Sequence, residues 1–171
     1  MTVTINGNGT ITPTSAVQPT GSVLQVVSAF KDDTASIAGG DNTQREFSTD
    51  LRANITPAST SSKVLVNCSL SLSAVSNIIT FKLLRTIGST TTEIANHTDA
   101  STVWHGCAGW WQNDEAYWTQ INFSFLDSPN TTSQVTYSPS GASGVTMWLN
   151  RIYNQATYTG TSSVTATEIA G

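Results

Sequence analysis

Residues 61–74 read SSKVLVNCSLSLSA, and from Val64 onward the apolar side chains take the even positions. The odd positions from Lys63 to Ser73 are polar, apart from Leu65. A period of two places successive side chains on opposite faces of a pleated strand. The stretch therefore predicts one long strand with a dry face and a wet face.

Two further runs show the same alternation and predict partners for this strand. Their residues of shared parity are Ile79, Phe81 and Leu83 in the first run, and Tyr117, Thr119, Ile121, Phe123 and Phe125 in the second. The apolar faces of these strands need to cover one another, which favours two sheets packed face to face. Shorter runs between polar turns predict strands at residues 23–30, 45–55, 134–138, 145–153 and 163–169. We expect an all-β fold, an antiparallel, jelly-roll-like β-sandwich.

The composition narrows the class of protein. Only 11% of the 171 residues are charged, against about a quarter in an average domain, and no window predicts a helix. The net charge of -4 and the seven scattered Lys and Arg residues offer no basic patch for nucleic acid. No segment approaches the roughly 18 consecutive apolar residues of a membrane helix, so we expect no membrane insertion.

The first twenty residues predict an arm on a single-domain body. Residues 2–5 and 10–12 are short extended runs on either side of Asn6-Gly7-Asn8-Gly9, and Asn-Gly pairs favour tight hairpin turns. We interpret residues 1–20 as this arm, with Val3, Ile5 and Ile11 as its anchoring side chains, and residues 21–171 as the body. An isolated two-stranded ribbon is marginal in water, so we expect it to dock on its own body or on a neighbour. A frayed terminus is the alternative.

Three shorter stretches predict a strand covered on both faces, a long loop and a turn. Residues 23–30 are apolar on both parities, which predicts a strand covered on both sides. Residues 31–44 contain Asp, Gly and few apolar residues and predict a long loop. Residues 140–144 read SGASG and predict a turn.

The segment from residue 98 to residue 118 is the part of the sequence with candidate site chemistry. It contains four Trp residues, and its candidate contact residues are Trp104, His105, Trp110, Trp111 and Asp114. Exposed Trp faces with nearby polar groups suit a glycan-binding surface. The alternative is that the Trp side chains close one end of the sandwich or pack between subunits. Trp118 carries least weight because it belongs to the following strand, on the face opposite Tyr117.

Metal and catalytic sites are not expected. His97, Asp99, His105 and Cys107 match no closed zinc spacing. Asp114 and Glu115 are adjacent, so on a strand they point apart and cannot flank one substrate as a glycosidase pair does. Cys68 and Cys107 are far apart in sequence, and we expect both to be free thiols.

Several strings in the chain resemble a family of tailed-bacteriophage virion proteins that is common in phages of marine and aquatic bacteria. They are TGSVLQVV at 20–27, LRANITP at 51–57, STSSKVLV at 59–66, LDSP at 126–129 and TEIAG at 167–171. The resemblance covers about residue 21 to residue 171, and the opening TVTING also resembles the starts of short phage fibre and decoration proteins. The Trp-rich segment 98–118 departs from the family pattern.

The resemblance implies a non-enzymatic virion protein without a cofactor. Met1 is followed by TVTI instead of the basic and apolar regions of a secretory signal, so we expect the protein to be made in the cytoplasm of the host bacterium. Family members are capsid decoration, head-fibre or tail-fibre proteins, and by analogy with phage fibres we expect a homotrimer that contacts other capsid or tail proteins. We predict a decoration or short head-fibre protein anchored through its arm. The alternative is a tail-fibre-type receptor-binding module that recognises host surface glycans through residues 98–118.

Overall fold

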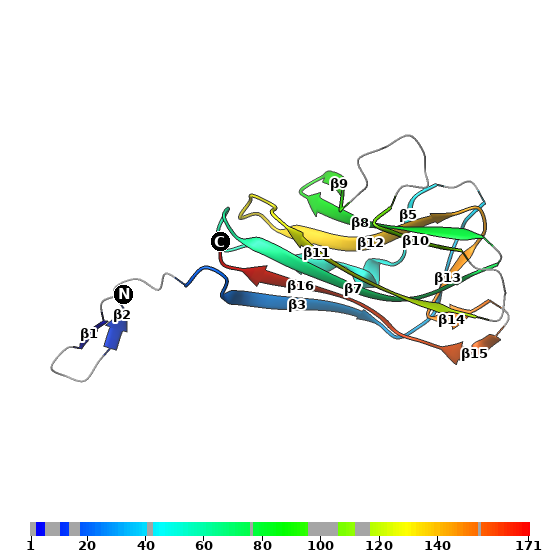
Figure 1. Cartoon of the computed structure of the whole chain (residues 1–171), viewed down its shortest axis with the longest axis horizontal. Helices are drawn as coiled ribbons and strands as arrows, with labels where there is room; N and C mark the ends of the chain where they lie inside the picture. Colours follow the sequence, from blue (N-terminus) through cyan, green and yellow to red (C-terminus); the bar gives the residue numbers. More distant parts are fainter. Residues whose placement is uncertain are drawn as a thin grey trace.

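Two antiparallel sheets of six strands each face one another and form the body (Figure 1). The computed structural model describes residues 3–5, 11–13, 18–40, 43–75, 77–95, 106–111, 117–153 and 155–171. The predicted all-β sandwich is confirmed, because the only helix in these ranges is one 3-10 turn, Thr49–Leu51.

Sheet I is built around the strand that the alternating sequence predicts. It contains β3 (Val23–Lys31), β4 (Ala35–Ile37), β7 (Lys63–Ala74), β11 (Thr119–Asp127), β13 (Met147–Leu149) and β16 (Ser162–Ile169). Strand β7 pairs with β11 along one side and with β16 and then β13 along the other. Strands β3 and β4 form the far edge, against β16 and β13.

Sheet II covers the apolar face of sheet I. It contains β5 (Arg45–Glu46), β6 (Ala53–Ile55), β8 (Ile78–Ile87), β9 (Thr90–Ile94), β10 (Ala108–Trp111) and β12 (Val135–Ser143). The central pair is β8 and β12. Strands β9 and β10 lie one after the other on the free side of β8, while β5 and β6 do the same on the free side of β12.

The strand order is that of a jelly roll. Short strands that share an edge count as one position, namely β3 with β4, β5 with β6, β9 with β10, and β13 with β16. Numbered along the chain, the positions then run 1-8-3-6 in sheet I and 2-7-4-5 in sheet II. This interleaving comes from two Greek keys wound together, and it closes the sandwich without parallel crossovers.

Two small ribbons lie outside the two sheets. Strands β1 (Val3–Ile5) and β2 (Ile11–Pro13) pair with each other, which agrees with the hairpin predicted from the Asn-Gly pairs. This ribbon lies beyond the end of the body where β3 begins and β16 ends (Figure 1). Strands β14 (Arg151–Ile152) and β15 (Gln155–Thr159) pair at the opposite end.

The core lies between the sheets and follows the parity of β7. Its even residues from Val64 to Ala74 are all at most 3% exposed, and Ile79, Phe81 and Leu83 of β8 are fully buried opposite them. The ring of Phe81 contacts the rings of Phe47 and Phe123, with centroids 6.5 and 5.5 Å apart. Truncating one such core side chain to Ala costs about 2–5 kcal/mol.

Polar contacts tie the sheets and the ends of the body together. Asp127 of β11 accepts hydrogen bonds from Arg85 (2.9 and 3.1 Å) and from the Tyr137 hydroxyl (2.7 Å), which belong to sheet II. Next to the arm, the Gly21 N–H donates to the Ala170 carbonyl, and the Ala170 N–H donates to the Ser22 carbonyl, both at 2.8 Å. The chain therefore enters and leaves the body at one place.

Some predicted boundaries are wrong. The strand at 45–55 is broken into β5, the 3-10 turn and β6, because the Ser48 hydroxyl caps the turn by accepting from the Asp50 N–H. The loop at 31–44 contains β4. The strand at 145–153 is interrupted at Asn150, whose φ of 60° is left-handed and cannot continue a strand.

Two predictions about cover and turns are also wrong. Strand β3 is an edge strand, and Val26 and Phe30 are each 59% exposed, so it is not covered on both sides. Residues 140–143 belong to β12 instead of forming a turn. Gly141 is needed there because a Cβ at this position would lie 2.4 Å from the Phe47 ring.

Candidate functional site

The predicted Trp site is described only in part. Trp110 and Trp111 lie in β10, opposite Ile79 and Ile78 of β8. Trp104, His105 and Asp114 lie outside the described residues. Whether the five residues form one contact surface therefore stays a prediction.

Aromatic side chains gather at the end of the body away from the arm. Tyr117 and Trp118 precede β11 and are 63% and 38% exposed, and Tyr158 of β15 is 59% exposed. A Cβ on Gly160 would lie 3.7 Å from the Trp118 ring, which places Trp118 beside the end of β15. From its position in the alternating sequence, Trp118 was expected to be the least important Trp residue of the candidate site. In the structure it is an exposed aromatic side chain at this end of the body.

The anchoring side chains predicted for the arm lie in the N-terminal ribbon. Ile5 is opposite Ile11, and Val3 is opposite Pro13. Among the described residues this ribbon shares no ladder with either sheet.

The outer face of sheet I is uncharged over three cross-strand rows, which we call the neutral face. Each row crosses β3, β16, β7 and β11: Val26, Thr167, Leu65 and Leu126; Ser28, Thr165, Asn67 and Ser124; Phe30, Ser163, Ser69 and Asn122. Val26, Phe30 and Leu126 are among the most exposed large apolar side chains of the described chain. Residues directly opposite on paired strands share one face, so the rows form one continuous surface.

The polar groups of the neutral face bond to one another. Ser28 and Thr165 share a hydrogen bond of 3.1 Å, Ser124 donates to Asn67 at 2.7 Å, and Ser69 donates to Asn122 at 2.9 Å. Covering a polar group costs little when its hydrogen bonds are already made. This face is therefore suited to being covered by another protein surface.

The outer face of sheet II contains a hollow of about 310 Å³. Its lining residues come from β5, β6, β8, β9 and β12 and from the segment between β5 and β6: Glu46, Arg52, Asn54, Leu84, Thr86, Thr91, Thr136 and Ser138. Arg52 donates to both carboxylate oxygens of Glu46, at 2.7 and 2.6 Å. Sequence reasoning missed this hollow, because strand pairing joins residues more than ninety positions apart, such as Glu46 and Ser140.

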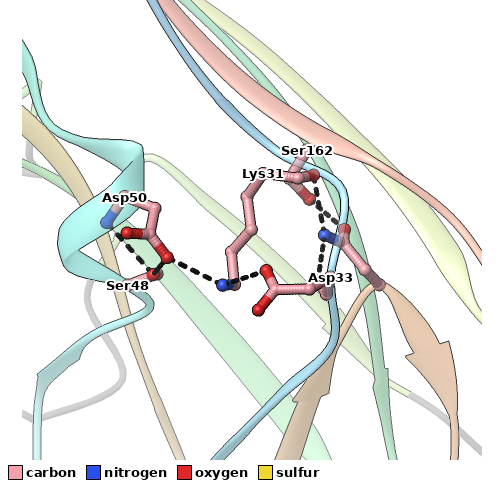
Figure 2. A network of polar contacts seen from close by, with 6 residues as sticks. Lys31, Asp33, Ser48, Asp50 and Ser162 are labelled. Atoms are coloured by element: carbon pink, nitrogen blue, oxygen red, sulfur yellow. Dashed lines mark hydrogen bonds and ion pairs between the residues drawn. The ribbon is translucent and has the colours of Figure 1, made fainter.

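A buried lysine network joins the edge of sheet I to the 3-10 turn. Figure 2 shows the Lys31 ammonium between the carboxylates of Asp33 and Asp50, with Ser48 bonded to Asp50. Lys31 is 5% exposed, and its hydrogen bonds to Asp33 and Asp50 raise its pKa despite burial. The hydrogen bond from Lys31 lowers the pKa of Asp50. A lysine held charged in this way is not a nucleophile or a base, so we assign the network to stability.

Asn150 extends this network into β16. Its amide NH₂ donates to the carbonyls of Lys31 and Asp33 (2.9 Å each), and its oxygen accepts from the Ser162 hydroxyl at 2.6 Å. The Asn150 side chain thereby joins the end of β3 and the start of β16 to its own segment, whose backbone is left-handed at Asn150.

The two cysteines are free thiols, as predicted. Burial raises the pKa of Cys68 to about 12 and that of Cys107 to about 11, so both stay protonated at neutral pH. Within the described ranges, no three His, Cys, Asp or Glu side chains gather into a metal-binding group. His97, Asp99 and His105 lie outside those ranges.

Comparison with known proteins adds a likeness of fold. No protein-family model and no curated sequence matches the chain. The structure of infectious bursal disease virus strain Gx aligns over 94% of this chain and 37% of that chain, with 11% identity and a TM-score of 0.49. The VP2 subviral particle of the same virus aligns over 94% and 38%, with 12% identity and a TM-score of 0.49. These neighbours are viral capsid proteins, and this chain spans less than half the length of each.

No helix in the described part of the chain has the length and apolar character needed to cross a membrane.

Proposed function

We propose that the chain is a non-enzymatic structural protein of a bacteriophage particle, a capsid decoration or short head-fibre protein that assembles as a homotrimer. The neutral face is the observation that carries this proposal. Protein interfaces are depleted of charge at their centres, and Ser, Thr and Asn side chains lose less rotamer freedom on burial than Lys or Glu. Three pairs of polar side chains on this face already bond to each other, which lowers the cost of covering them.

The N-terminal ribbon supports an attached role. A two-stranded ribbon that shares no ladder with the described sheets gains stability by lying on another surface. The phage family resemblance adds the virion context and the three-fold assembly. We assign the arm to the contact with capsid or tail proteins and the neutral face to the contact between subunits.

The subunit contact is tested by placing a charge on the neutral face. Ser163 lies on inner strand β16 between Phe30 and Ser69, in the third row of the neutral face, and Ser163→Lys puts an ammonium beside the exposed Phe30. Thr90→Lys, on the exposed start of β9, is the matched control. Sedimentation at micromolar concentration is expected to give a trimer for the wild type and the control, and a monomer for Ser163→Lys. A monomeric wild type, or a Ser163→Lys trimer of equal stability, contradicts the proposal.

A second candidate function is host recognition through the Trp-rich segment. The exposed side chains of Trp118 and Tyr158 favour it, because Tyr158 belongs to β15, at the end of the body away from the arm, and Trp118 lies beside the end of this strand. A protein held by its arm presents this end outward, and exposed aromatic rings stack on sugar faces. On this hypothesis Trp110→Ala, Trp111→Ala and Trp118→Ala abolish binding to host cells and leave folding intact. Misfolding or dissociation of these variants assigns the Trp residues to packing.

A further inference from the structure

We propose that the hollow on the outer face of sheet II binds one residue of a neutral saccharide. The hollow lies on the sheet opposite the neutral face, and its lining residues do not include the Trp-rich segment. The inference therefore depends neither on the virion role nor on recognition through the Trp residues.

One polar row crosses the hollow from edge to edge. Thr91, Thr86, Thr136 and Asn54 lie directly opposite one another on β9, β8, β12 and β6. Thr86 and Thr91 share a hydrogen bond of 2.9 Å, and Thr136 donates to the Asn54 side-chain oxygen at 2.6 Å. Neighbouring strands are about 4.8 Å apart, which is comparable to the separation of hydroxyl groups across a pyranose ring.

The hollow also contains hydrogen-bonding groups that are not used. Ser138 lines it and is only 4% exposed, yet its hydroxyl has no hydrogen-bond partner among the described residues. Asn54 uses its oxygen for Thr136, and no described residue accepts from its NH₂ group. A ligand hydroxyl placed in the hollow can therefore bond to the Ser138 hydroxyl and to the Asn54 NH₂ group without displacing a bond within the protein.

The charges around the hollow are paired, which favours a neutral ligand. Two nitrogens of the Arg52 guanidinium donate hydrogen bonds to the Glu46 carboxylate. In the neighbouring rows Lys82 donates to Glu93 at 2.7 Å. An anion placed here meets the Glu46 carboxylate, and a cation meets the Arg52 guanidinium. A neutral polyol avoids both repulsions and still bonds to the groups that remain open.

The remaining contact and the volume fit a single sugar residue. Leu84 is the one apolar side chain of the lining and lies between Ser138 and Glu93 across the strands. It offers a contact for the C–H face of a sugar ring. A volume of about 310 Å³ is at the low end of small-molecule sites, which run from roughly 300 to 1,000 Å³. With no aromatic residue in the lining, we expect millimolar affinity.

Saturation-transfer NMR with simple sugars tests the proposal. The probes are the methyl glycosides of glucose, galactose, mannose and N-acetylglucosamine, with N-acetylneuraminic acid and glucosamine as charged comparators. At least one neutral glycoside is expected to bind the wild-type protein, and more tightly than either charged sugar. The proposal is overturned if no neutral glycoside binds at tens of millimolar, or if a charged sugar binds best.

Paired alanine variants locate the binding. Asn54 lines the hollow and accepts one hydrogen bond at 2.6 Å, whereas Thr90, at the exposed start of β9, lies outside both the lining and the neutral face. Asn54→Ala is expected to weaken binding at least fivefold, and Thr90→Ala is expected to leave it unchanged. Ser138→Ala is expected to weaken binding similarly, and thermal melting checks its fold. Equal weakening by Thr90→Ala, or unchanged binding in Asn54→Ala, overturns the assignment to this hollow.

Discussion

At the scale of single residues, Glu168 is a fully buried carboxylate held by neutral groups. Its oxygens accept from Gln25 at 2.6 Å and from the Ala58 N–H at 2.7 Å. Burial on its own raises the pKa of this carboxyl, but interactions with the Ser62 hydroxyl, Gln25 and the Ala58 amide together hold the pKa below its ordinary value. The charged form therefore joins β16 to β3 and to the turn that precedes β7.

Glu168→Gln is expected to lower the free energy of unfolding at pH 7 by about 1–3 kcal/mol, because a Gln NH₂ group faces donors in place of an acceptor. A carboxyl whose pKa is lowered by folding stabilises the protein above its unfolded pKa of 4.5, and this stabilisation disappears as the pH falls through the folded value. The difference in the free energy of unfolding between wild type and Glu168→Gln should thus be constant from pH 7 to pH 5 and become smaller below pH 4.5. Urea unfolding across this range measures it.

The control for this pH series is Asp32→Asn, which changes an exposed carboxyl. It should alter stability by less than about 0.5 kcal/mol. If the stability difference between wild type and Glu168→Gln instead grows as the pH falls below 4.5, Glu168 does not stabilise the fold in its charged form.

Residue parity was predictable from sequence where one face is dry and the other is wet. In β7 the even positions are buried from Val64 to Ala74, as the alternation predicts, but the odd residues Ser71 and Ser73 are buried too, so the predicted exposed face does not extend to the end of the strand. The same reasoning failed for β3, whose apolar residues on both parities include the exposed Val26 and Phe30. Parity reports which residues share a face, but the cover on each face depends on strands that are distant in sequence.

At the scale of secondary-structure elements, glycine in β12 makes room for a core ring. A Cβ on Gly141 would lie 2.4 and 2.6 Å from two atoms of the Phe47 ring and 2.8 Å from the Thr80 carbonyl oxygen. The SGASG string looks like a turn because Gly and Ser are common in turns. Here the same glycine lies within a strand and leaves space for the Phe47 ring.

Gly141→Ala is expected to destabilise the protein by about 1–3 kcal/mol, because the added methyl group overpacks the core against Phe47. Gly88→Ala is the comparison, since Gly88 has a φ of 58° in the open β8–β9 turn and nothing within 4 Å of an added Cβ. Its cost is limited to backbone strain of about 1 kcal/mol. Urea unfolding measures the loss of stability in both variants. A larger loss for Gly88→Ala than for Gly141→Ala contradicts the role of Gly141 in leaving space for Phe47.

The short elements were the ones that sequence reasoning missed. Strand β4 has three residues, and β15 reads QATYT, so neither has enough apolar residues for a periodic signal. The hollow in sheet II was not predictable for a related reason. Glu46, Asn54, Leu84 and Ser138 come together only after β5, β6, β8 and β12 have paired.

At the scale of the whole molecule, the body has two unlike ends. The arm, the entry into β3 and the exit from β16 lie at one end, and β14 and β15 lie at the other (Figure 1). The exposed Tyr158 belongs to β15, and the exposed Trp118 lies beside the end of this strand. Sequence order predicted the arm and the Trp-rich segment as separate features. The placement of Trp118 beside the end of β15, away from the arm, required the jelly-roll topology.

Deletion of residues 1–20 is expected to leave the body folded and trimeric and to abolish its attachment to phage particles. The reason is that β1 and β2 form their own ladder, whereas the Gly21 N–H that holds the start of the body is retained. Thermal melting and sedimentation report on the body, and co-sedimentation with purified particles reports on attachment. Loss of the trimer assigns the arm to the subunit contact, and retained attachment removes its role as an anchor.

The paired hydrogen bonds of Gly21 and Ser22 with Ala170 determine what a label at the C-terminal end of the body reports. A gold particle or fluorescent protein joined after Gly171 starts beside the root of the arm, although nearly the whole body lies between the two points in sequence. If the proposed function is correct, its density in electron micrographs of labelled particles marks where the arm contacts the virion surface. The direction in which the opposite end projects needs a second label, placed near β15.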